Sequence, residues 1–236
     1  MTRTGRLAFA GLLVAVAAWA GTALAQTTPL PPDVTKPEPT VPEIYTLMGQ
    51  FVRVAYNNEG YVILGYRMAN DSVGQEWMML DLGATIRRGL PHYPLTREAL
   101  SVKTPDGKTI PMATQKEYAE AGYLRALNQR AKMMRDSISY FPLDAHTACA
   151  ARFFGDIGSA ASMSYDQVEL SSDRACVGRL FFKVPGGIQH GQHWLIVKFA
   201  NSQVEVPFRI LTKDEAKYLK KEWENLKKEL DKDLEK

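Results

Sequence analysis

Two histidines three residues apart, His190 and His193, are the residues whose type and spacing most readily suggest metal chemistry in this chain. They lie in the stretch GGIQHGQHW, and the chain contains four histidines in total. A zinc site needs three or four ligands, usually histidine, cysteine or carboxylate groups. The other two histidines, His92 and His146, fall in separate loops and would have to approach this stretch in space.

The local spacing argues against such a metal site. Residues i and i+3 of a β-strand face opposite sides, so a regular strand would point His190 and His193 away from each other. Only a turn at Gly191 would bring the two rings together. We therefore predict no metal and no cofactor. A metal- or small-ligand-binding module that uses the His190/His193 loop remains the alternative function.

Other catalytic chemistry has less support in the sequence. Glu76 and Asp81 are neighbours along the chain, but they follow a surface turn, whereas paired catalytic carboxylates need a cleft. The chain lacks the G-x-S-x-G nucleophile elbow, the glycine-rich phosphate-binding motifs and the H-E-x-x-H zinc motif. We predict that the protein is not an enzyme. An enzyme of unrecognised type would need a deep pocket in which a base and a nucleophile converge.

Aromatic residues gather in the first half of the chain, where exposed rings would make a platform for a partner or a sugar. The alternative is that they belong to the core, which is the commoner place for aromatic residues at alternating positions. The residues concerned are Tyr56, Tyr61, Tyr66, Trp77 and Tyr93.

Residues 1–25 have the organisation of a secretory signal peptide. Arg3 and Arg6 precede an uncharged apolar run, which ends in the small-x-small pattern of Ala23-Leu24-Ala25. Cleavage after Ala25 would place the mature protein in the periplasm or outside the cell. If the segment stays uncleaved, it would anchor the protein to a membrane, and this is the only membrane contact that the sequence predicts.

Residues 26–43 form a proline-rich segment. Proline fixes φ and removes a backbone donor, so the segment is expected to be an extended tether. Residues 44–211 are then long enough to form one domain with one core. Removal of the signal peptide takes away two arginines and no acid, so the formal net charge falls from +3 to +1. We see no cluster of positive charge, and therefore predict no nucleic-acid partner.

Cys149 and Cys176 are the two cysteines of the chain. An exported protein meets an oxidising compartment, so we predict a structural disulfide between them. A redox pair is the alternative, but such pairs usually have the C-x-x-C spacing that is missing here.

Short segments with apolar residues at every second position predict half-buried β-strands. These segments cover residues 51–56, 61–70, 77–88, 100–112 (a hairpin), 138–143, 152–157, 167–171, 178–185, 193–200 and 204–211. Pro207 cannot donate to a ladder, so the last of them is predicted to be an edge strand. The pattern predicts a mainly β fold, an antiparallel β-sandwich of the immunoglobulin-like type.

Two segments have helical periodicity instead. Residues 114–135 are predicted to form one amphipathic helix of about five turns, opened by a capping box of Thr114 and Glu117. Residues 212–236 are predicted to form a long C-terminal helix, opened by Thr212 and Glu215. From Lys213 onward it holds eight basic and eight acidic residues, a balance that argues against an arm for phosphates or anionic lipids.

Apolar residues recur along the C-terminal helix at spacings of four, three and four: Leu219, Trp223, Leu226 and Leu230. This stripe is expected to bind either the protein's own domain or a partner, as a docking helix or a short coiled coil. Fewer than four heptads make a marginal coiled coil by themselves.

Three segments carry a resemblance to known proteins: YVILGYRMANDSVGQEWMMLDLGATIRRG, TPDGKTIPMATQ and DRACVGRLFFKVPGGIQHGQHWLIVKFANSQVEVPFRIL. With them the chain resembles exported bacterial proteins, of the sort seen in acidobacteria, that have an immunoglobulin-like sandwich and no assigned activity. The resemblance extends over nearly the whole mature chain. It implies a fold and an exported location, and it supplies no catalytic residues. We predict an exported, non-enzymatic protein that contacts a protein partner in the cell envelope.

Overall fold

The computed structural model describes residues 44–134, 136–155 and 163–234 of the chain. The predicted signal peptide (1–25) and tether (26–43) lie outside these residues. The described chain is mainly β, as predicted. None of its helices is long and apolar enough to cross a membrane.

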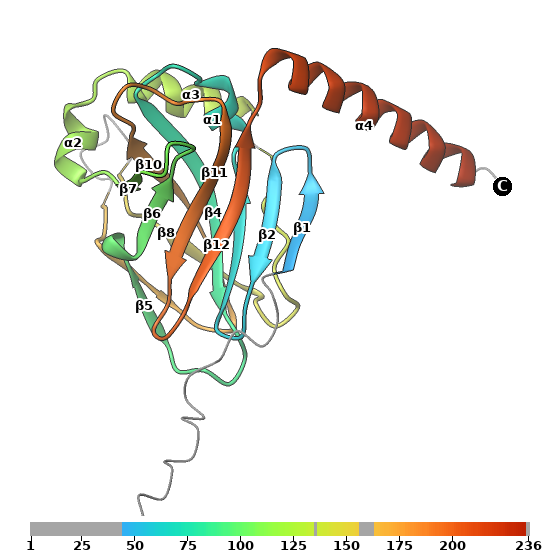
Figure 1. Ribbon diagram of the computed structural model, residues 1–236. Coiled ribbons are helices and arrows are strands. Elements are labelled where there is room, and N and C mark those ends of the chain that lie inside the picture. Colours follow the sequence, from blue (N-terminus) through green and yellow to red (C-terminus); the bar gives the residue numbers. More distant parts are fainter. Residues whose placement is uncertain (1–43, 135, 156–162, 235–236) are drawn as a thin grey trace, which may run out of the picture. The chain divides into compact units, whose positions relative to one another are not determined.

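The strands and helices follow one another along the chain as shown in Figure 1. The strands are β1 (Ile44–Gly49), β2 (Val52–Tyr56), β3 (Gly60–Gly65), β4 (Trp77–Ile86), β5 (Tyr93–Thr96), β6 (Leu100–Lys103), β7 (Thr109–Pro111), β8 (Thr147–Ala151), β9 (Gln167–Leu170), β10 (Arg174–Lys183), β11 (Gly191–Lys198) and β12 (Gln203–Ile210). The helices are α1 (Arg67–Asp71), α2 (Gln115–Glu120), α3 (Leu124–Met134) and α4 (Lys213–Leu234), with a short 3-10 turn η1 (Arg97–Ala99) before β6.

The strands form open sheets. A six-stranded sheet has the order β1-β2-β3-β4-β10-β8, and a four-stranded sheet has the order β12-β11-β6-β7. All neighbours in them are antiparallel except β8, which runs parallel to β10 and makes the larger sheet mixed. β5 and β9 pair separately. β12, which contains Pro207, lies at the edge of its sheet, which confirms the edge strand predicted from that proline.

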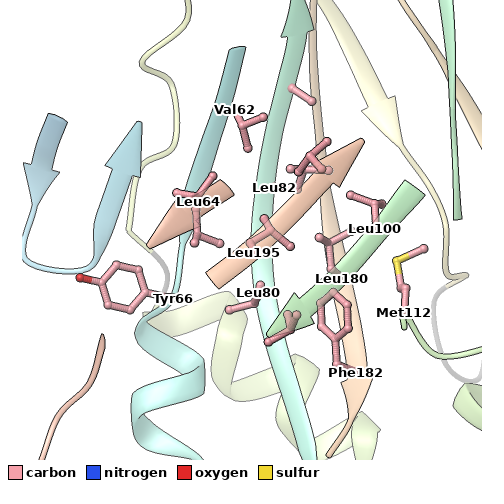
Figure 2. Close-up of a cluster of buried hydrophobic side chains, with 14 of the residues drawn as sticks. Val62, Leu64, Tyr66, Leu80, Leu82, Leu100, Met112, Leu180, Phe182 and Leu195 are labelled. Carbon is pink, nitrogen blue, oxygen red and sulfur yellow. The ribbon is translucent and has the colours of Figure 1, made fainter. Parts of the chain in front are cut away.

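The two larger sheets share one hydrophobic core, part of which is drawn in Figure 2. Leu64, Leu80 and Leu82 of the larger sheet meet Leu100 and Leu195 of the smaller sheet in this core, and all five are fully buried. Burial of each such side chain contributes about 1.5–3 kcal/mol relative to its exposure. The alternating apolar positions of the sequence therefore correspond to the faces that the sheets turn toward each other.

The opposite face of the six-stranded sheet is also covered, in two patches. Leu124, Leu127 and Ala131 of α3 pack on Met79 of β4 and Phe181 of β10. Farther along the sheet, Ile138, Tyr140 and Phe141 lie against Val54 and Ile63. This cover explains why all ten residues of β4 are buried, although alternation predicted a strand with only one buried face.

The helix predicted for 114–135 is in fact two helices. The capping box of Thr114 and Glu117 is present and starts α2, but α2 ends at Glu120 and α3 begins at Leu124. Gly122 lies at the break, where glycine disfavours a continuous helix by about 1 kcal/mol relative to alanine. The break lets Tyr118 and the α3 stripe bury their side chains in the same cluster.

The strand predictions for 138–143 and for 152–155 are wrong, and residues 156 and 157 lie outside the described chain. Residues 138–143 pair with no strand of the described chain, because their alternating apolar side chains cover a sheet face instead of extending a sheet. The strand predicted to continue through residue 70 ends at Gly65 and is followed by α1.

The predicted disulfide between Cys149 and Cys176 is confirmed. The two residues are direct neighbours across the parallel pair of β8 and β10, with their Cα atoms 4.2 Å apart. The bond therefore fastens the edge strand β8 to the sheet that carries it.

Candidate functional site

His193 is buried inside the domain. It lies in β11 with no exposed surface, and its ring stacks on Phe208 with the two centroids 5.3 Å apart. Its Nδ1 lies 3.1 Å from the carbonyl oxygen of Gly191. Its Nε2 is buried and has no hydrogen-bond partner among the described residues. Burial lowers the pKa of this imidazole, so the folded protein favours the neutral ring.

The structure places the other histidines apart from His193. His190 is exposed in the loop before β11. His92 Nδ1 lies 2.8 Å from a carboxylate oxygen of Glu169, and the ring of His146 lies against its own loop. Nowhere in the described part of the chain do three histidine, cysteine or carboxylate side chains form a group that could hold a metal ion.

We expect His193→Phe to remove part of the acid sensitivity of the fold. Because the folded pKa is lowered, the unfolded chain binds this proton first as pH falls below about 6.5, and stability is lost from there downward. A phenylalanine has no proton to bind and removes the unpaired Nε2, while the Gly191 carbonyl loses its contact with Nδ1 at both pH values. Urea unfolding at pH 7.5 and 5.0 should show a smaller loss of stability in the variant. An equal loss in the two proteins would contradict this assignment.

The aromatic cluster of the first half forms no exposed platform. Tyr66 and Trp77 are buried. Tyr56 and Tyr61 are half-buried and stack on each other with centroids 5.4 Å apart, while Tyr93 leans on Phe199. The core interpretation of these residues is therefore the correct one.

The start of α4 is held by polar contacts with the end of β12 and with α1. Thr212 and Glu215 form the predicted capping pair, in which Thr212 N–H donates to Glu215 at 2.9 Å and Glu215 N–H donates back to Thr212 at 3.3 Å. The Arg209 guanidinium donates to the same carboxylate and holds the pKa of Glu215 at about 2. Asn70 of α1 accepts a hydrogen bond from Leu211 N–H at 2.8 Å.

The described side chains of α4 are more exposed than those of the long strands. Tyr218 is 65% exposed, Leu219 is half-buried, and no described side chain of this helix is buried. A groove of about 390 Å³ at its base is lined by Arg209, Leu211, Asp214, Glu215, Tyr218 and Leu219. The side chains of Trp223, Leu226 and Leu230, the rest of the predicted partner-binding stripe, lie outside the described ones.

A polar pocket on the outer face of the six-stranded sheet was not predicted from the sequence. It has a volume of about 710 Å³ and lies between the residues that follow α3 and the strands β4 and β10. Asp81 of β4 and Arg179 of β10 are register partners on its floor, with Arg179 Nε 3.7 Å from the Asp81 carboxylate. Only the register of two strands that are about 100 residues apart in sequence brings this pair together.

The sequence did contain a signal for this pocket. Asp81 stands in the middle of an apolar run, WMMLDLGATI, and it is buried in the structure. A buried carboxylate is costly unless charged or polar groups surround it. Glu76, the other carboxylate considered as a catalytic partner, is exposed and does not line the pocket.

Comparison of the chain with protein-family models, with curated proteins and with solved structures gives no match, so its function has to be inferred from its own residues and geometry.

Proposed function

We propose that this is an exported, non-enzymatic protein that contacts a protein partner in the cell envelope through α4. The observation that carries the proposal is the exposure of this helix, in which no described side chain is buried although its sequence is amphipathic. An amphipathic helix gains most of its stability from burying its apolar face. Leu219, the one member of the stripe whose side chain the structure describes, is only half-buried, and a partner that covers the apolar face would supply the missing burial.

Export is supported by two independent features. Residues 1–25 have the organisation of a signal peptide. The Cys149–Cys176 disulfide is of the kind that persists in oxidising compartments. We therefore propose that the protein works in the periplasm or outside the cell.

The immunoglobulin-like class and the kinship with exported proteins of the acidobacterial sort are also proposals. Two facing sheets around one core and the β11–β12 hairpin support this class. The four-strand meander β1–β4 and the parallel β8–β10 pair are features that such a sandwich would have to accommodate.

The anchoring of α4 favours contact in trans over packing on its own domain. Its first turn is held by Arg209 and by Leu211, so its direction at the root is set by the fold. Its charges are balanced, which excludes an anionic surface as the main partner and leaves the apolar stripe to give affinity. Of the four apolar residues in the stripe, Trp223 is of the type that most often dominates the binding energy of a protein interface.

The experiment compares the mature protein with a version that ends at Leu211, which keeps every strand of the domain. Each is tagged, returned to its own host and recovered from the envelope fraction after cross-linking. We expect a partner that is recovered with the full chain and lost with the shorter one. Identical partners for the two proteins would contradict a role for α4. A partner that proves to be a second copy of this chain would place the contact in a homodimer.

A further inference from the structure

We propose that the polar pocket on the six-stranded sheet is a binding site for a small carboxylate ligand that also carries hydroxyl or amino groups. This inference is independent of the proposed contact through α4. The pocket has about 710 Å³, within the range of roughly 300–1,000 Å³ that is usual for small-molecule sites.

The pocket lies between the two segments that cover the outer face of the six-stranded sheet, because α3 and the segment 138–141 do not meet. α3 covers Met79 and Phe181, one step along β4 and β10 toward one end of the sheet. Phe141 covers Gly83 on the other side, since a Cβ atom at Gly83 would lie 2.9 Å from its ring. Asp81 and Arg179 lie on the same strands between these two apolar patches. The pocket therefore has a polar floor with apolar side chains on either side.

Glycine in the neighbouring strand shapes the wall of the pocket. Gly65 of β3 is the register partner of Asp81. A Cβ atom there would lie 3.2 Å from both Asp81 Cβ and Ile138 Cγ2, which is tighter than ordinary contact. The missing side chain lets the segment that contains Ile138 come down close to the floor.

The floor of the pocket holds Arg179, an arginine whose orientation is set by a neighbouring side chain. Arg179 Nη1 donates to the side-chain oxygen of Asn128 at 3.1 Å. Its Nε is 3.7 Å from Asp81, which is beyond hydrogen-bond distance. A guanidinium has five N–H donors in a fixed fork that matches a carboxylate in bidentate geometry. Arg179 is thus oriented by Asn128, and its fork has more N–H donors than this one hydrogen bond uses.

The charges of the pocket favour an anion. Arg67 and Asp136 neutralise each other through a bidentate pair, with nitrogen–oxygen distances of 2.7 and 3.0 Å. Among the described residues that line the pocket, the remaining charged groups are Asp81 and the two arginines Arg179 and Arg152, the second of them exposed at the rim. These described groups sum to one positive charge, and a carboxylate is the ligand group that complements it.

Acceptors in the same pocket specify the rest of the ligand. The carboxylates of Asp81 and Asp136 and the hydroxyl groups of Ser137 and Ser139 line it beside the arginines. Carboxylates only accept hydrogen bonds when ionised, so the matching ligand must offer O–H or N–H donors. A hydroxycarboxylate or an amino acid has both features, whereas a neutral sugar lacks the anion and a simple fatty acid lacks the donors.

The test is calorimetric titration of the mature full-length protein with D-glucuronate, lactate and alanine as probes, and with glucose as the neutral comparison. We expect at least one of the three charged probes to bind with a Kd tighter than about 1 mM. Glucose should bind at least tenfold more weakly than that probe, because it has no carboxylate to form a charge-assisted pair with Arg179. Absence of binding by all three charged probes, or equal binding of glucose, would overturn the proposal.

Variants decide whether binding occurs in this pocket. Arg152→Gln and Arg179→Gln should each weaken the charged probe roughly tenfold to hundredfold, the range for loss of a charge-assisted hydrogen bond. Arg152 is exposed, so its variant keeps the test valid even if Arg179→Gln disturbs folding. The matched control is Arg88→Gln, an exposed arginine in the turn after β4 that does not line the pocket. An equal affinity in all these proteins would place the binding elsewhere and contradict the assignment.

Discussion

Replacement of Gly60 with alanine is expected to lower the free energy of unfolding by about 2–4 kcal/mol. The reason is that the new methyl group would overpack the core and displace an aromatic ring. Gly60 opens β3, and the ring of Phe199 lies directly over its Cα. A Cβ atom at this position would lie 2.1 Å from both Cε2 and Cζ of that ring. Phe199 is only 5% exposed and cannot swing away without leaving the core.

A double-mutant cycle shows whether the ring is the cause. Gly60→Ala in a Phe199→Ala background should add little further loss, because the clashing atoms are gone. The control for the alanine itself is Gly122→Ala, where a Cβ atom meets nothing within 4 Å. Urea unfolding gives all four free energies, and losses that simply add in the double variant would refute the proposed clash.

The surroundings of Gly60 explain why the loss is expected to be large. Glu59, which is buried, accepts hydrogen bonds from Asn201 N–H at 3.1 and 3.2 Å and from the Ser202 hydroxyl at 2.6 Å. Asn57 donates to the same hairpin tip at Ser202. The turn before β3 therefore fastens the two large sheets together at one end, and a shift of Phe199 would disturb this junction as well.

Arg97→Met is expected to cost about 3 kcal/mol or more, since each hydrogen bond to a buried charged group is worth roughly 1.5–3 kcal/mol. Its guanidinium is almost completely buried and donates to the carbonyl oxygens of Ala113 at 2.8 Å and Phe153 at 2.5 Å. It also lies 4.6 Å from the ring centroid of Phe154. One side chain thus holds two separate connections of the chain, the one between β7 and α2 and the one between β8 and β9.

A second replacement of Arg97 distinguishes the effect of its charge from the effect of its planar geometry. Arg97→Lys keeps the charge, but an ammonium group cannot reach two divergent carbonyl groups as the planar fork does, so most of the loss should remain. Arg88→Met, at an exposed position, is the matched control and should change stability by less than about 0.5 kcal/mol. Full stability of Arg97→Lys in urea unfolding would mean that charge alone is needed there.

Much of the fold was predictable from local patterns. Period-two alternation located the strands of the four-stranded sheet and β2, β3, β4 and β10 of the six-stranded sheet, but it missed the two edge strands β1 and β8. The T-x-x-E pattern located the starts of α2 and α4, because capping depends on residues that are close in sequence. The disulfide followed from the cysteine count and the expected export. These signals depend on neighbouring residues or on composition, so they can be read without knowledge of the tertiary structure.

The failures share a physical cause. Residues 138–143 alternate as a strand does, but their apolar side chains cover the sheet and their backbone pairs with no described strand. Alternation reports which side chains are buried and does not report what they are buried against. The pair of Asp81 and Arg179 was missed for a related reason, because strand register between β4 and β10 is a long-range property. The stacking of His193 on Phe208 was likewise out of reach of the sequence, because it depends on the pairing of β11 with β12.

The central claim, contact through the apolar stripe of α4, is tested most directly by comparing two faces of the same helix. One variant carries Leu219→Gln and Trp223→Gln, and its matched control carries Lys220→Gln and Glu224→Gln, so both keep residues compatible with a helix. The measurement is the amount of cross-linked partner recovered per molecule of the mature protein. We predict a loss of tenfold or more with the stripe variant, and little change with the control. Equal recovery in the two variants would contradict the claim.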